Sequence, residues 1–174
     1  MRQDSPGFLL QQSLLSLNIP VSEQIFRKND WGKPYLASHA VEFSLTHASY
    51  YAACALDASP VGLDLEAPRI TMAVAKRYFH PQEFAFLEAL PEPEQTDALL
   101  RLWTIKEAYT KQLGSGLHIP LDSFYADLRE NGLYLYKDSR RIPVHLHEYR
   151  LDSLRLCLCS NSERPEITQF IPNL

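Results

Sequence analysis

The chain has 174 residues, of which 45% are hydrophobic, and a formal net charge of −4 at pH 7. That length suffices for one sizeable hydrophobic core, and the acidic balance argues against the general affinity for nucleic acids or membrane surfaces that a basic protein would have. Its three cysteines are too few for a disulfide framework and no apolar run reaches the ~20 residues of a transmembrane helix, so we expect a cytoplasmic protein with reduced thiols.

The first half of the chain is expected to span residues 1–91 and to combine an early helix, a group of strands and two short helices. Leucines cluster between Gly7 and Pro20, aromatic and β-branched residues are frequent at 41–56, and prolines delimit the later helices. In chain order, the sequence predicts a helix at 8–17, a short strand with turns within 25–36, two strands within 41–56 with a break at 47–49, a strand at 61–66 that completes a meander, and helices at 71–79 and 81–90.

The second half, 92–174, is expected to consist of a long helix over about 93–113 followed by a β-rich tail. Acidic residues open the predicted helix, Gly114 stands where it should end, and Asn131 with Gly132 forms a hairpin signal. Strands are predicted at 123–129, 133–137, 144–149 and 154–160. This order predicts an α+β fold of two pseudo-symmetric halves, each a small, mostly antiparallel sheet with packed helices, which form one compact unit with the active site in the cleft between them.

The most informative segment is the strand predicted at 61–66, which reads VGLDLE. Asp64 and Glu66 stand two residues apart, so both carboxylates leave one face of a strand while Leu63 and Leu65 leave the other. Neighbouring carboxylates repel each other unless a cation lies between them. Gly62 removes a side chain just before the acids, where a ligand has room to approach the backbone. The pair is a candidate metal site, and the alternative is a solvated face or a surface ion pair.

A second segment, WTIKEAYTK at 103–111, falls on the predicted long helix. Trp103, Glu107 and Lys111 are spaced by four residues and therefore line one stripe of that helix. A third carboxylate and a cation beside the acidic strand indicate a site for a metal-bound diphosphate, because hard cations take oxygen ligands and lysine binds phosphate. The alternatives are a surface salt bridge for Glu107 and a packing role for Trp103.

These two segments closely resemble the paired signature of the Sfp-type 4′-phosphopantetheinyl transferases. The resemblance extends to five more segments, which are GKP at 32–34, FSLTH at 43–47, AKRYFHPQEF at 75–84, LGSGL at 113–117 and LDSF at 121–124. Together they cover about residues 31–124. Each segment alone is a weak signal, and the match depends on their order and spacing.

The resemblance implies a Mg²⁺-dependent transfer of the 4′-phosphopantetheine arm of coenzyme A to a serine hydroxyl of an acyl or peptidyl carrier protein, with release of adenosine 3′,5′-bisphosphate. It implies Asp64, Glu66 and Glu107 as metal ligands and Glu107 with Lys111 as catalytic residues, with Glu107 or a metal-bound water as the general base. Glu83 matches a carboxylate facing the metal region, or is an acid of a first helical turn. The implied contacts to coenzyme A come from Lys33, Pro34, Thr46, His47, Lys106, Lys111 and, by a loose alignment, Arg2.

Only residues 1–6 precede the first predicted helix, so the chain resembles a short member of the family with few N-terminal cations for the 3′-phosphate of coenzyme A. A start codon assigned too late, a natural short form and a homologue without activity are the competing explanations. Two rival functions follow: a non-catalytic binder of coenzyme A or a carrier protein, and an unrelated Mg²⁺-dependent phosphohydrolase. Because both halves of the site belong to one chain, we expect a monomer.

Overall fold

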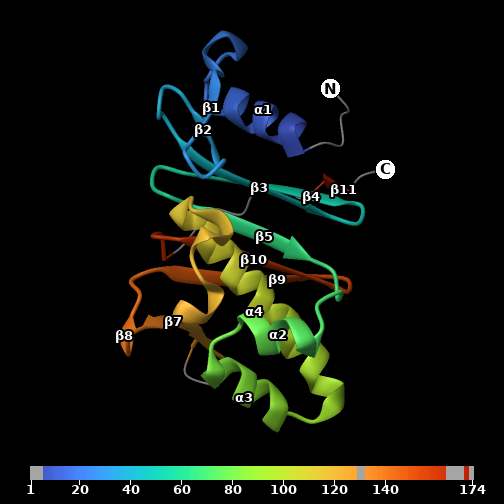
Figure 1. Cartoon of the computed structure of the whole chain (residues 1–174). Coiled ribbons are helices and arrows are strands. Elements are labelled where there is room, and N and C mark those ends of the chain that lie inside the picture. The colour runs from blue at the N-terminus through green and yellow to red at the C-terminus, as the bar shows by residue number, and fades with distance from the viewer. Residues whose placement is uncertain (1–5, 129–131, 164–170, 173–174) are drawn as a thin grey trace.

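The N-terminal part of the molecule is a helix packed on a pair of antiparallel strands (Figure 1). The computed structural model describes residues 6–128, 132–163 and 171–172. The first elements are α1 (Pro6–Ser16), the 3₁₀ turn η1 (Val21–Glu23), the hairpin strands β1 (Phe26–Lys28) and β2 (Pro34–Leu36), and the antiparallel strands β3 (Glu42–Ala48) and β4 (Tyr51–Asp57). Leu10 and Leu14 bury one face of α1 against Phe43. The helix predicted at 8–17 and the two strands predicted within 41–56 are confirmed.

Strand β5 (Gly62–Glu66) lies in a sheet with two strands from the far end of the chain. The sheet order is β5-β10-β9, where β9 is His145–Leu151 and β10 is Leu154–Ser160, and both pairs are antiparallel. The predicted meander is therefore wrong, because 61–66 pairs with β10 and not with the strand before it. The leucines of β5 and β10 share one buried cluster, so this pairing completes an apolar face that neither segment completes alone.

β5 also lies beside β3, but side chains rather than main-chain pairs join these two strands. The N–H of Leu63 donates to Ser44 Oγ (2.9 Å), and the N–H of Leu65 donates to Thr46 Oγ1 (3.0 Å). Both hydroxyl-bearing residues are buried, and a buried amide without a partner would cost about 1–3 kcal/mol. We call this junction the β3/β5 seam, formed by Ser44, Thr46 and residues 61–65.

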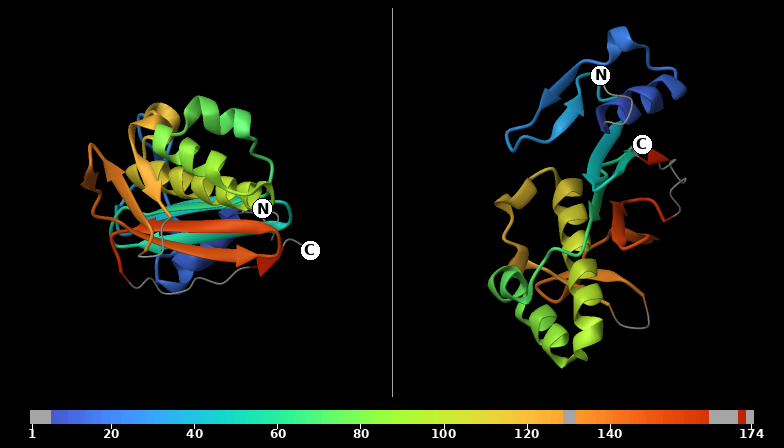
Figure 2. Two further views of the ribbon diagram at one scale, coloured as in Figure 1. Left: turned by 90° about the horizontal axis from the view of Figure 1, so that it is seen from below. Right: turned by 90° about the vertical axis from the view of Figure 1, so that its right-hand side faces the viewer.

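Three helices lie on one side of the β5-β10-β9 sheet, and the longest of them packs directly on β5 and β10 (Figure 2, left). They are α2 (Met72–Tyr78), α3 (Pro81–Ala89) and α4 (Glu92–Leu113). Acidic residues in the first turn of α4 and Lys111 in its last turn complement the helix dipole, and Gly114 ends the helix with a positive φ of 72°. The helices predicted at 71–79, 81–90 and 93–113 are confirmed.

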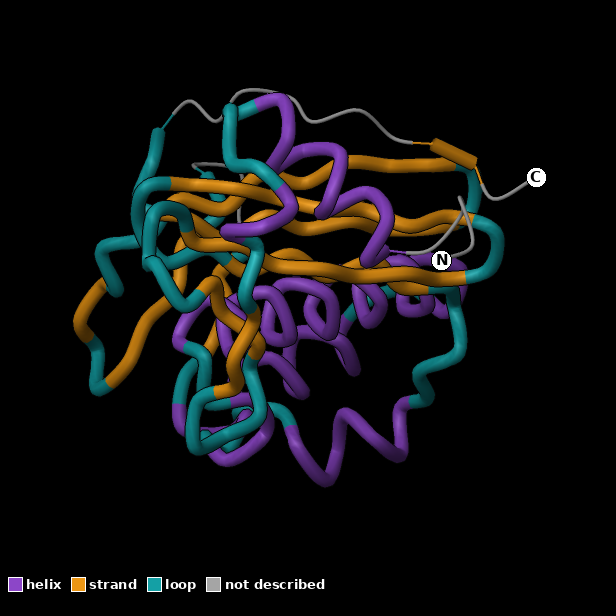
Figure 3. The backbone as a smooth tube through the Cα atoms, turned by 90° about the horizontal axis from the view of Figure 1, so that it is seen from above, coloured by secondary structure: helices purple, strands orange, loops and turns teal. Residues whose placement is uncertain are grey.

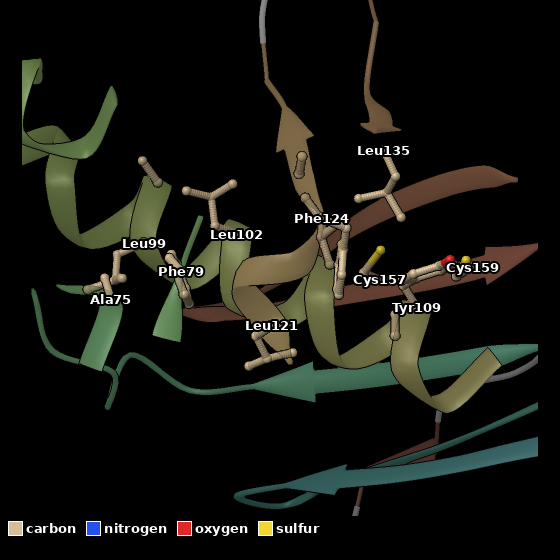
Figure 4. Close-up of a cluster of buried hydrophobic side chains, with 14 of the residues drawn as sticks. Ala75, Phe79, Leu99, Leu102, Tyr109, Leu121, Phe124, Leu135, Cys157 and Cys159 are labelled. Carbon is tan, nitrogen blue, oxygen red and sulfur yellow. The ribbon is translucent and has the colours of Figure 1, made fainter. Parts of the chain in front are cut away.

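The main hydrophobic core lies between these helices and the sheets (Figure 4). Leu102 and Tyr109 of α4 pack there with Phe124, and Cys157 and Cys159 of β10 complete the cluster. The described chain contains free, buried cysteines, which agrees with the expectation of reduced core thiols.

Gly62 allows α4 to lie directly on β5. A Cβ atom at Gly62 would overlap the carbonyl oxygen of Ala108 and the amide nitrogen of Gln112. The space beside Gly62 is therefore filled by helix backbone, and the prediction that a ligand approaches there is wrong. This close contact brings the part of α4 that carries Glu107 and Lys111 over the acidic residues of β5.

Three of the remaining strands form a small sheet, and the last strand of the chain pairs with β4 in the N-terminal part of the molecule (Figure 3). After the 3₁₀ turns η2 (Gly116–His118) and η3 (Leu121–Ser123), the strands are β6 (Tyr125–Asp127), β7 (Tyr134–Lys137), β8 (Arg140–Arg141) and β11 (Ile171–Pro172). β7 pairs with both β6 and β8, and the predicted hairpin signal at 131–132 lies partly outside the described residues. The antiparallel sheets confirm the predicted fold class.

The boundary predicted near residue 91 is crossed by two strand pairings. β5 from the first half pairs with β10, and β11 from the second half pairs with β4. The division into 1–91 and 92–174, and its pseudo-symmetry, stay predictions. Among the described helices, not one combines the length and the apolar character that crossing a bilayer requires.

Candidate active site

Asp64 is the centre of the candidate site. Its side chain is on the face of β5 that α4 covers, and the residue is only 3% exposed. Lys111 Nζ lies 2.6 Å from Asp64 Oδ1 and also donates to the carbonyl oxygen of Leu63 (3.1 Å). Within the described chain, Asp64 Oδ2 is buried and accepts no hydrogen bond. Burial raises the pKa of Asp64 to about 6, against the opposing effect of Lys111. One carboxylate oxygen thus lacks a donor or cation.

Glu107 faces the same centre from α4. The pKa of Glu107 is raised to about 7, mainly by burial and then by the nearby charges of Asp64 and, more weakly, Glu66, against the opposing effect of Lys111. Glu66 is near enough to contribute to this repulsion, although its Oε2 also pairs with Arg69 Nη2 at 3.2 Å. The structure therefore brings together the three predicted carboxylates and Lys111, and the carboxylates destabilise one another's charged forms.

The donor set of this centre suits a hard divalent cation. It offers carboxylate oxygens only, one of which is the unpartnered Asp64 Oδ2. Among residues 6–128, 132–163 and 171–172, no three acidic, histidine or cysteine side chains are already arranged as a complete metal cage. Lys111 instead supplies the positive charge at Asp64 Oδ1. The residues fit Mg²⁺ by their chemistry, and binding would require Glu66 or Glu107 to move toward Asp64.

A pocket of about 240 Å³ lies where α4 ends, and Lys111, the partner of Asp64, is on its wall. It is lined by Trp31, Gly32, Lys33, Pro34, Phe43, Ser44, Leu45, Lys111, Gly114 and Gly116. The walls come from the β1–β2 hairpin, β3 and the C-terminal end of α4, so the pocket lies between the two predicted halves. Lys33 and Pro34, predicted to contact coenzyme A, are thus placed beside Lys111.

The turn before β2 is docked onto the end of α4 by one asparagine. Asn29 Nδ2 donates to the carbonyl oxygen of Gly114 (2.8 Å), while its Oδ1 accepts the N–H groups of Trp31 and Lys33. Gly32 takes a positive φ of 87° within this turn. Sequence reasoning missed Asn29, because its partner lies 85 residues away and no local pattern encodes that contact.

Lys33 and Lys111 approach β5 in the same manner. Lys33 Nζ donates to the carbonyl oxygen of Val61 (3.0 Å), as Lys111 does to that of Leu63. Carbonyl groups two residues apart on a strand point the same way, so both ammonium groups lie along one edge of β5. Burial lowers the pKa of Lys33, with Glu42 opposing that effect. The pocket is therefore bordered by two cations at the β3/β5 seam.

Thr46 and His47 occupy different positions from the carboxylate centre. Thr46 is buried in the β3/β5 seam, where its Oγ1 accepts the N–H of Leu65, and its own hydroxyl hydrogen is available for donation. His47 follows it on the opposite face of β3 and is exposed. Neither residue lines the pocket beside Lys111, and Arg2 lies outside the described residues. Their predicted contacts with coenzyme A stay predictions.

Lys106 is not placed for a phosphate contact, which corrects the prediction. Its side chain is fully buried and its Nζ lies 2.8 Å from Glu83 Oε2. Adjacent residues on a helix project about 100° apart, so Lys106 and Glu107 face different sides of α4. Glu83 caps the first turn of α3 and does not face the metal region. Of the two predictions for Glu83, the acid of a first helical turn is therefore the correct one. Trp103 stacks near Phe79, in agreement with a packing role.

Comparisons with known proteins agree on one family. A family model described as the 4′-phosphopantetheinyl transferase superfamily matches residues 60–159, which include Asp64, Glu66, Glu107 and Lys111. The chain is 35% identical over 144 residues to the 4′-phosphopantetheinyl transferase gsp of Aneurinibacillus migulanus, covering 82% of this chain and 60% of that protein. It is 31% identical over 160 residues to the 4′-phosphopantetheinyl transferase Sfp of Bacillus subtilis, covering 88% of this chain and 71% of that protein.

A solved structure of holo-[acyl-carrier-protein] synthase from Thermotoga maritima is also similar, with a TM-score of 0.48 and 20% identity. The match covers 57% of this chain and 61% of that one.

Proposed function

The chain belongs to the 4′-phosphopantetheinyl transferase superfamily, and from that premise we propose that it transfers the 4′-phosphopantetheine arm of coenzyme A to a serine hydroxyl of an acyl or peptidyl carrier protein. The co-product would be adenosine 3′,5′-bisphosphate. The observation that supports this reaction is the meeting of Asp64, Glu66, Glu107 and Lys111 beside a pocket that a second lysine borders. This combination suits a diphosphate whose negative charge must be offset at several points.

Asp64, Glu66 and Glu107 would hold Mg²⁺ through carboxylate oxygens. The ion, when bound, offsets the charge of the diphosphate oxygens. The unpartnered Asp64 Oδ2 and the raised pKa values of Asp64 and Glu107 support this assignment, since a cation would favour the ionised forms of both acids. Carboxylates that are costly to bury alone would thereby gain a partner.

Lys33 and Lys111 would bind phosphate oxygens from the edge of β5. Each ammonium group carries three donors, and the described structure assigns one donor of Lys33 and two donors of Lys111 to protein oxygens. The exposed Pro34 offers the pocket a surface against which an adenine ring can pack. Coenzyme A would thus be oriented with its diphosphate toward Glu107.

Glu107 is the proposed acceptor of the serine proton. In the transfer, the serine oxygen forms a bond to the phosphorus that carries pantetheine, and the bond from that phosphorus to the bridging oxygen of the diphosphate breaks. The electron pair leaves with adenosine 3′,5′-bisphosphate, and Lys111 would stabilise the charge on its phosphate. Because bound Mg²⁺ would favour the ionised form of Glu107, this carboxylate would be available as a proton acceptor at neutral pH.

Incubation with coenzyme A, Mg²⁺ and several apo carrier proteins tests this proposal. The expected result is the phosphopantetheine mass increment on the carrier and an equal amount of adenosine 3′,5′-bisphosphate. Measurable binding of coenzyme A with no increment on any carrier would instead support a non-catalytic binder. Breakdown of coenzyme A without a carrier would support a phosphohydrolase.

A further inference from the structure

A fully buried ion pair joins α4 to α3 and takes no part in the proposed chemistry. Lys106 Nζ lies 2.8 Å from Glu83 Oε2, and the exposed fractions of the two side chains are 0% and 1%. Removing two charges from water costs about as much as their attraction returns, so such a pair is poorly explained by stability alone. Burial lowers the pKa of Lys106 and raises the pKa of Glu83, and in each case the partner's charge opposes the shift.

Lys106 uses all three of its donors to hold the segment that follows α4. Besides Glu83, its Nζ donates to the carbonyl oxygens of Leu121 (2.6 Å) and Phe124 (2.8 Å). The ammonium group also lies 4.2 Å from the centre of the Phe124 ring and 5.5 Å from that of Phe79. These rings and Leu121 surround the core side of α4 (Figure 4). One side chain of α4 therefore fixes both ends of the η3 turn.

Glu83 connects the same point to two further elements. Its Oε1 accepts the N–H of Ala126 in β6 (2.8 Å), and its Oε2 accepts the N–H of His80 at the start of α3 (3.0 Å). The two charged side chains together join α3, α4, η3 and β6 at a single buried position. Each hydrogen bond to a charged group contributes more than a neutral one, so this junction is rigid for its size.

The junction is close in sequence to both parts of the candidate site. Gly114 and Gly116 line the pocket, and the chain reaches the first anchored carbonyl, at Leu121, only five residues after Gly116. On α4, Lys106 directly precedes Glu107. We propose that Glu83 and Lys106 are positioning residues that hold residues 114–126 against α4, so that the pocket wall and the helix segment carrying Glu107 behave as one rigid unit. The consequence for turnover rests on the proposed function.

The test combines amide hydrogen exchange with turnover in a double variant, Glu83→Gln with Lys106→Met. Both charges are removed together at nearly constant volume, so no buried charge is left unpaired. We expect exchange at residues 121–126 to accelerate by about tenfold or more while the amides of α4 keep their protection. We also expect kcat/KM for coenzyme A to fall by about tenfold or more per folded molecule.

A matched control is Asp97→Asn with Arg155→Met, which removes a different ion pair that joins α4 to β10. Its exchange at 121–126 and its turnover should equal those of the wild type. Wild-type exchange and wild-type kcat/KM in the Glu83 and Lys106 variant would overturn the proposal, because the pair would then be structural only.

The unmodified protein supplies a second test that does not depend on the variant folding. If the pair holds the segment rigidly, the amide of Ala126 should exchange as slowly as the central amides of α4, through the same global opening. Faster local exchange at 121–126 in the wild type would overturn the proposal. A wild-type protein that modifies no carrier would refute the proposed function, and the exchange data would still decide the positioning role.

Discussion

Replacement of Glu107 by glutamine should stabilise the metal-free protein at alkaline pH while abolishing transfer. The pKa of Glu107 is raised from 4.5 to about 7, first by burial and then by Asp64. This difference corresponds to about 3 kcal/mol against the ionised form at pH 8, and partial solvent screening reduces the expected effect to about 1–3 kcal/mol. Glutamine has nearly the same shape and no charge, so the variant avoids this cost.

The pH dependence of the effect follows from the direction of the shift. A carboxyl group whose pKa is higher in the folded state contributes its full stability below about pH 4.5, and that contribution is lost as the pH rises through about 7. The variant does not titrate at this position. The difference in free energy of unfolding between Glu107→Gln and wild type should therefore be near zero at pH 4.5 and grow to its full size above pH 7.

Urea unfolding in EDTA at several pH values between 4.5 and 8 measures this difference. Glu94→Gln is the control, because Glu94 is an exposed acid in the first turn of the same helix and its loss should cost about 0.3–1 kcal/mol instead. In saturating Mg²⁺ the wild type should instead be the more stable of the two proteins, since only the wild type keeps all three proposed metal ligands. A Glu107→Gln variant that is no more stable than wild type at pH 8 in EDTA would refute the reasoning.

Three further predictions concern β5 and the pocket. Asp64→Ala should abolish Mg²⁺-dependent transfer with the fold retained in circular dichroism, and residual metal-dependent turnover would exclude Asp64 as a ligand. Gly62→Ala should lower the free energy of unfolding by about 3 kcal/mol or more, because the added methyl group meets the backbone of α4; an unchanged urea midpoint would contradict that contact. Lys33→Met should weaken binding of coenzyme A by about ten- to a hundredfold in calorimetry, and unchanged affinity would place the diphosphate elsewhere.

The sequence predicted local elements well and long-range pairings poorly. The acidic residues in its first turn and Gly114 after its last turn define the two ends of α4. Ser49, at the predicted break, takes a positive φ of 54° between β3 and β4. These signals act within a few residues. The pairing of β5 with β10 depends on leucines about ninety positions apart, and the alternation within 61–66 satisfies either neighbour equally.

The same limit applies to the site residues. The four-residue spacing of Glu107 and Lys111 correctly put both on the side of α4 that faces Asp64. Lys106 directly precedes Glu107 in sequence, yet its partner is Glu83, on a helix whose position relative to α4 no spacing rule predicts. Which lysine faces the pocket and which is buried is therefore decided by tertiary packing. Similarly, the role of Asn29 becomes visible only when the β1–β2 turn meets the end of α4.

At the β3/β5 seam, ligand binding competes with internal hydrogen bonds for the ammonium groups of Lys33 and Lys111. A lysine that turned away from the strand to give a phosphate more than its unassigned donors would leave the carbonyl oxygen of Val61 or Leu63 without its donor, at a cost of about 1 kcal/mol or more for each. The contacts recorded from β3 to this edge of β5 are hydroxyl groups that accept from its N–H groups, so the two lysines supply the recorded donors to these carbonyl oxygens. This competition would weaken the binding of any anion in the pocket. When the anion leaves, the lysines would again donate fully to the carbonyl oxygens of Val61 and Leu63. Under the proposed function, a site organised in this way would give up some affinity for its nucleotide product and would release it faster.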